Sequence, residues 1–251
     1  MRSNQTGGAG ETTTVGGALR ELVGASETRL ALVLATLVVG AGAAFILAFI
    51  LQPSDRTLVA VAPLVQVIMS VLTPLSTAVL TYDLRDPDGD FRSRTAVPLR
   101  SRWIASGLYG LAVGAAGVVI AAVAVAVVVG ANPPFDPWAG AVPVVVGSLL
   151  VQLIPVGVGC AAGLLIPRAG LAALATVVVP LTFTLLVGLL TPQGTADWVT
   201  PLGAASHLVP GPMTAINWAQ WIVTAALWVV LPNAIGARRL RDRADRSARN
   251  D

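Results

Sequence analysis

His207 and Asp197 are the two residues of this chain whose types and spacing come closest to acid–base chemistry. His207 is the only histidine, and Asp197 is the only acidic residue near it in the sequence. A histidine beside a carboxylate can accept and release a proton near neutral pH. A lone histidine is more often structural than catalytic, so the pair does not by itself predict an enzyme.

Other signatures of catalysis are incomplete. Asp88 and Gly89 match the start of a membrane phosphotransferase motif, but the third apolar run contains no pair of aspartates to hold the metal ion. The chain has no phosphate-binding loop of the form GxxxxGKS or GxxxxGKT. Its single cysteine, Cys160, lies in an apolar run, which excludes an internal disulfide and a cysteine metal cluster. We therefore expect a protein that is not an enzyme, with no catalytic residues, no metal site and no cofactor of its own.

The elements that carry these residues are those of a membrane protein. The chain is 55% hydrophobic and 12% charged, whereas an ordinary soluble domain carries about a quarter charged residues. Six apolar runs reach or approach the roughly 20 residues that a helix needs to cross the hydrocarbon core. These runs are residues 30–51, 57–80, 103–130, 141–166, 170–190 and 218–235. The sequence predicts an all-α integral membrane protein with six transmembrane helices, residues 18–236.

The flanking segments and the arginines predict the orientation. Residues 1–17 are rich in Gly and Thr and predict a disordered tail, residues 18–29 an interfacial helix, and residues 237–251 a basic tail. The chain has no lysine, and 15 of its 16 arginines fall in segments on one side of the six-span arrangement. Only Arg56 falls on the other side. Because positive loops stay inside, we expect a multi-pass protein of the cell (plasma) membrane with both termini cytoplasmic.

Polar groups inside the runs are few and uncharged. No Asp, Glu, His, Lys or Arg occurs there, which disfavours a carrier coupled to protons or sodium ions. Prolines within the runs predict bent or broken helices, and the glycine pairs Gly110/Gly114 and Gly159/Gly163 predict close helix packing. Six polar side chains are candidates for a substrate path, with bonding inside the bundle as the alternative: Gln66, Ser70, Thr73, Gln152, Thr182 and Thr184.

Charge is concentrated between the second and third runs, at residues 81–103. The segment contains four aspartates and five arginines, and this surface of mixed sign suits a protein partner better than an anionic lipid. Residues 89–97 can form a short helix that Pro98 ends, with Phe91 as an exposed apolar anchor. An ordinary solvated loop that obeys the positive-inside rule is the alternative interpretation.

This layout resembles the membrane subunits of ABC-2 type transporters, which have the type V exporter fold. Those subunits have an amphipathic helix before span one, six spans, a coupling helix between spans two and three, and a small outer element between spans five and six. Asp88-Gly89-Asp90-Phe91 and Val97-Pro98-Leu99-Arg100-Ser101-Arg102 stand where the coupling segment lies. Residues 195–217, broken by prolines, are similar to the partly re-entrant outer helices of the family.

The resemblance implies a permease subunit of an ATP-driven exporter that moves an amphipathic drug-like, antibiotic or lipid-like compound outward. It implies partner ABC ATPase subunits that bind ATP and Mg²⁺, and a second permease chain in a homodimer or heterodimer. No nucleic-acid partner is expected. The alternatives are a secondary carrier without an ATPase, and a membrane assembly or immunity factor that moves nothing. The residues expected to dock the ATPase are Asp86, Asp88, Gly89, Phe91, Arg92, Arg94, Pro98, Arg100 and Arg102.

Overall fold

The computed structural model describes residues 27–82, 99–129, 136–192, 194–208 and 213–250, and every regular element in these ranges is helical. The elements are α2 (Glu27–Ile50), η1 (Pro53–Asp55), α3 (Leu58–Tyr82), α4 (Leu99–Val129), α5 (Ala141–Val151), α6 (Leu153–Leu165), α7 (Ala169–Leu190), α8 (Thr195–Val199), α9 (Pro201–Leu208), α10 (Ala215–Ala225), the π-helical turn η2 (Ala226–Val230) and α11 (Leu231–Asn250). Within the described residues there is no strand.

Six helical segments are long and apolar enough to cross a membrane. They are Ala31–Ile50, Leu58–Tyr82, Trp103–Val129, Ala141–Leu165, Ala169–Leu190 and Ala215–Arg239. Each overlaps one of the six apolar runs, so the expectation of an all-helical chain with six such helices is confirmed. The fourth segment is made of α5 and α6, and the sixth is made of α10, η2 and the start of α11.

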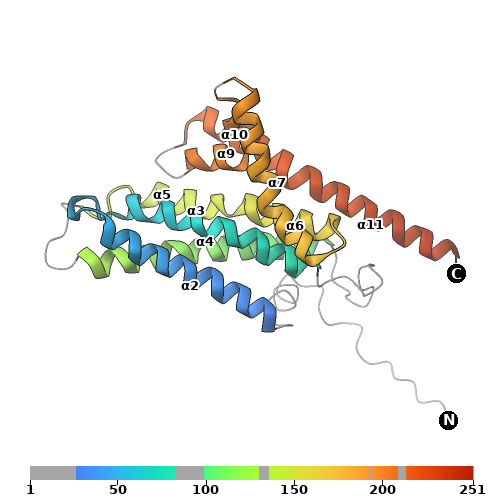
Figure 1. Ribbon diagram of the computed structural model, residues 1–251, viewed down its shortest axis with the longest axis horizontal. Coiled ribbons are helices and arrows are strands. Elements are labelled where there is room, and N and C mark those ends of the chain that lie inside the picture. The colour runs from blue at the N-terminus through green and yellow to red at the C-terminus, as the bar shows by residue number, and fades with distance from the viewer. Residues whose placement is uncertain (1–26, 83–98, 130–135, 193, 209–212, 251) are drawn as a thin grey trace, which may run out of the picture.

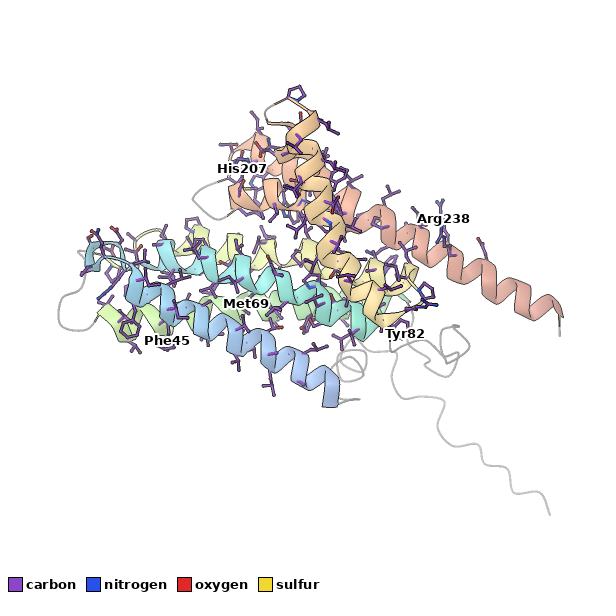
Figure 2. The ribbon with its side chains drawn as sticks, in the orientation of Figure 1. Phe45, Met69, Tyr82, His207 and Arg238 are labelled. Atoms are coloured by element: carbon purple, nitrogen blue, oxygen red, sulfur yellow. The ribbon has the colours of Figure 1, made fainter. Side chains whose placement is uncertain are left out.

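Helix α3 is the centre of the molecule. It packs against α2, α4, α5, α6 and α7, and its side chains at Val61, Val65 and Met69 are fully buried. Figure 1 shows α2 to α6 lying side by side, with α7 rising steeply away from the end of α6. The last helix runs past α7 and carries Arg238 out beyond the bundle (Figure 2). Spans five and six pack on one side of this group, α7 against α3 and α6, and the sixth span against α6.

Glycines allow the helices of the first four spans to pack closely, as the pairs Gly110/Gly114 and Gly159/Gly163 predicted. A Cβ added at Gly114 would lie 2.9 Å from the carbonyl oxygen of Ser148, and one at Gly159 would lie 2.5 Å from that of Pro74. No real side chain tolerates such contacts with backbone. The interpretation of these glycines as packing positions within the bundle is confirmed.

Several predicted features lie outside the described residues. These are the tail at residues 1–17, most of the interfacial segment 18–29, and seven docking residues: Asp86, Asp88, Gly89, Phe91, Arg92, Arg94 and Pro98. Arg100 and Arg102 lie in the first turns of α4, which begins at Leu99. Residues 27–29 form the start of α2, and residues 237–250, expected as a basic tail, continue the helix α11.

Candidate functional site

A break in the fourth span positions Gln152 inside the bundle. Helix α5 ends at Val151 and α6 begins at Leu153, so Gln152 lies between two helices. Pro155 accounts for the break, because it has no N–H to donate to the carbonyl of Val151 four residues earlier.

Gln152 and Gln66 bind each other across the bundle. The Nε2 of Gln152 donates to the Oε1 of Gln66 at 2.7 Å and to its backbone oxygen at 3.1 Å. The Nε2 of Gln66 in turn donates to the carbonyl of Gly114 at 2.8 Å. Both glutamine side chains are fully buried. These bonds join α3, α4 and the broken fourth span, where an unpaired amide would be costly.

Thr73 completes this cluster on α3. Its Oγ1 lies 3.0 Å from the Oε1 of Gln152 and 2.8 Å from the carbonyl oxygen of Met69, so one hydroxyl proton is shared between two acceptors. Thr73 is also fully buried. We call Gln66, Thr73 and Gln152 the buried amide cluster. Three of the six residues expected to line a substrate path thus bind one another in this arrangement.

A cavity of about 120 Å³ opens beside this cluster, between α3, the fourth span, α7 and α9. Of the six expected residues, only Ser70 lines it. Thr182 is exposed on α7, and the hydroxyl of the half-buried Thr184 donates to the carbonyl of Pro180 at 2.8 Å. The lining residues are Ser70, Val71, Pro74, Val151, Ile154, Pro155, Val158, Thr176, Val177, Pro180, Leu181, Pro201, Leu202, Ala205 and Leu208.

Prolines from three spans meet at this cavity. One comes from each of α3, α6 and α7: Pro74, Pro155 and Pro180. The residues four positions earlier line the cavity as well: Ser70, Val151 and Thr176. Because proline has no N–H, each of these three residues has a carbonyl that lacks its usual helical partner. The carbonyls that proline leaves without a helical partner therefore belong to residues that line one cavity.

Helix α9 covers the cavity from the segment between spans five and six. Leu208, at its end, is buried against Val151. Val151 stands ten residues from the start of α5, about 15 Å along the helix axis. The segment between spans five and six therefore folds back along the fourth span.

The sixth span holds α8 in this position. The hydroxyl of Thr224 donates to the carbonyl of Trp198 at 3.1 Å, and the indole Nε1 of Trp228 donates to the carbonyl of Val199 at 2.7 Å. Trp228 lies in the π-helical turn and meets the ring of Phe183 edge to face, with centroids 5.3 Å apart. Sequence reasoning missed this role. A tryptophan in the middle of a span, where its N–H needs a partner, is the signal that could have found it.

His207 and Asp197 come together, as their sequence spacing suggested. The Nε2 of His207 lies 3.5 Å from the Oδ2 of Asp197, and about a third of each side chain is exposed. The pair joins the short helices α8 and α9 (Figure 2 labels His207). In the part of the chain that the structure describes, no group of three or more His, Cys, Asp or Glu side chains could hold a metal ion. The geometry gives the pair a structural contact between two helices.

Comparison with known proteins adds no relative. No family model matches the chain, and no curated protein and no solved structure matches it.

Proposed function

We propose that this chain is the transmembrane permease subunit of an ATP-driven exporter of the ABC-2 type, which moves an amphipathic compound outward. One observation carries the proposal: between spans five and six the chain folds back, and its helix α9 covers a cavity lined by three spans. This arrangement agrees with the partly re-entrant outer element that the family resemblance implies. It gives the chain a place where a ligand can be held within the membrane.

The helices around the cavity are suited to movement. Prolines in α3, α6 and α7 remove hydrogen bonds from the middle of each span, which lowers the cost of bending there. The most mobile wall is expected to be α7. Many of its side chains are exposed, including Leu185, Leu189 and Leu190, so its outward face is not held by contacts within the chain. These exposed side chains form an apolar surface for lipid or for the second permease chain.

The energy for transport is proposed to come from a partner. The six apolar runs contain no Asp, Glu, His, Lys or Arg that could bind a coupling ion, and the chain has no phosphate-binding loop. A separate ATPase would dock on the charged segment at residues 86–102, on the cytoplasmic side. Loss of one apolar anchor from that segment should then uncouple the two proteins.

The test is Phe91→Asp in the full-length chain, purified from its native membrane in a mild detergent. We expect the unaltered chain to bring a stoichiometric P-loop ATPase with it, and the variant to lose that ATPase, because a charge replaces an anchor that fills a groove. Phe135→Asp is the matched control, since it makes the same change in the loop on the opposite side. Equal ATPase recovery with all three chains would remove Phe91 from the interface, and no ATPase with any of them would contradict the proposal.

A further inference from the structure

We propose that the cavity between α3, the fourth span, α7 and α9 binds a neutral amphiphile. Its ring-sized apolar group fills the cavity, and its hydroxyl or amide N–H donates to a backbone carbonyl that proline has left without a helical partner. This inference names the ligand class of the proposed permease. It rests on the proposed function only for the movement of the ligand, because binding is a property of this chain alone.

The size of the cavity sets the size of the apolar group. Its volume is about 120 Å³, and it is partly open, so the rest of a ligand can extend outward. An apolar cavity of about 150 Å³ in another protein is known to hold benzene. The walls here are mostly aliphatic, as at Val71, Ile154 and Leu181. The space therefore suits one small ring or a short branched chain.

The wall includes residues whose backbone carbonyls proline has left without a helical N–H, and such acceptors favour a ligand with a donor. The two hydroxyl side chains of the cavity wall already donate within their own helices. The Oγ of Ser70 donates to the carbonyl of Val67 at 2.7 Å, and the Oγ1 of Thr176 donates to the carbonyl of Ala173 at 2.7 Å. The carbonyls of Ser70, Val151 and Thr176 have lost the N–H of Pro74, Pro155 and Pro180. None of the side-chain hydrogen bonds among the described residues ends on these three carbonyls. A ligand with a donor satisfies an acceptor that the chain leaves open.

The absence of charge in the wall favours a neutral ligand. None of the lining residues is Asp, Glu, His, Lys or Arg. An ammonium or carboxylate placed there would lose its water without gaining a counter-ion, which costs far more than one hydrogen bond returns. A hydroxyl or amide N–H gains a partner without that penalty. The expected ligand therefore combines a small apolar group with an uncharged donor.

The first experiment measures binding to the purified full-length chain in detergent. The probe is a benzyl alcohol that carries a photoreactive trifluoromethyl-diazirine on its ring, and the matched probe is its methyl ether, which keeps the ring and the oxygen but has no donor. We expect saturable labelling by the alcohol within α7 or α9, and at least threefold weaker labelling by the ether. A single hydrogen bond in a membrane protein is worth about 0.6 kcal/mol, which corresponds to about threefold.

Two sets of variants separate the donor site from the apolar site. Pro74→Ala, Pro155→Ala and Pro180→Ala each return an N–H to one carbonyl. At least one of these variants should weaken labelling by the alcohol about threefold and leave labelling by the ether unchanged. Pro63→Ala makes the same change in α3 away from the cavity and should alter neither probe. Ala205→Phe should fill the cavity and reduce labelling by both probes at least tenfold, whereas Ala215→Phe on the exposed face of α10 should not.

Each outcome decides one part of the proposal. Equal affinity for alcohol and ether, or no selective loss in any of the three proline variants, would overturn the donor site. Undiminished labelling of Ala205→Phe, or labelling that does not saturate in the unaltered chain, would overturn the cavity as a site. Competition by protonated benzylamine equal to that by benzyl alcohol would overturn the neutral ligand. Saturable binding without transport by any ATPase would contradict the proposed function and leave this inference standing.

Discussion

The buried amide cluster and the cavity lie side by side in the same spans, but they treat polar groups in opposite ways. At the cluster, buried side chains pair with one another and with backbone: Gln152 binds Gln66, and Gln66 binds the carbonyl of Gly114. At the cavity, the carbonyls four residues before Pro74 and Pro180 receive no side-chain donor among the described residues. The difference indicates a rigid region built for stability and a neighbouring region that leaves acceptors open for a ligand.

The largest effect should come from breaking the close packing of the rigid region. Gly159→Ala would place its Cβ 2.5 Å from the carbonyl oxygen of Pro74, and because this neighbour is backbone, it cannot move aside cheaply. We expect a loss of about 3 kcal/mol in the free energy of unfolding, followed by titration with a denaturing detergent. Gly188→Ala is the control, because nothing lies within 4 Å of its added Cβ, and it should be neutral or slightly stabilising. Equal effects of the two substitutions would contradict the packing account.

A smaller effect should follow when the amide cluster loses one member. Gln152→Leu removes the partner of Gln66 and of Thr73 and leaves buried polar atoms unpaired, which should cost about 2 kcal/mol of unfolding free energy. The double variant Gln66→Leu with Gln152→Leu should recover part of that loss, because no amide then stays unpaired. Additive losses in the double variant would show that the two amides do not depend on each other.

The smallest effect should come from the pair of short helices α8 and α9, which we call the cover of the cavity. Trp228→Phe removes the N–H that binds the carbonyl of Val199 but keeps a ring against Phe183. The free energy of unfolding should therefore fall by about 1 kcal/mol. Hydrogen exchange should speed up in α8 and α9 and stay unchanged in α3 and α4, since the lost bond holds only the cover. Faster exchange throughout the bundle would show that the cover is not a separate unit.

The sequence predicted the spans because each apolar run is long and separated from the next by polar or proline-rich residues. It also predicted the packing glycines, since small residues four apart on an apolar helix have few other uses. The segment between spans five and six was less predictable. Pro201 was expected to interrupt helical structure, but it begins α9, where its missing N–H would have been unpaired in any case. The sixth span starts at Ala215, three residues earlier than expected, because the hydroxyl of Thr214 caps it by accepting from the N–H of Asn217.

The candidate site was the least predictable part. Ser70 and Thr73 are three residues apart on α3, yet Ser70 lines the cavity and Thr73 belongs to the buried cluster. Spans that are apolar on all sides carry no pattern that separates an inner from an outer face. The useful signal was the position of the prolines, since the lining residues Ser70, Val151 and Thr176 all stand four residues before one. That three of these sites converge depends on tertiary packing, which no local pattern encodes.

The central claim, that a partner's ATP hydrolysis drives ligand movement through this chain, is tested most directly in proteoliposomes. The purified chain is reconstituted alone and with the ATPase that co-purifies with it, and release of the benzyl alcohol probe is followed with ATP and Mg²⁺ or under an imposed proton or sodium gradient. The account predicts movement against the probe's concentration gradient only with the ATPase, ATP and Mg²⁺ together. The reason is that the apolar runs contain no charged side chain that could bind a coupling ion. Gradient-driven movement by the chain alone, abolished by an ionophore, would contradict it.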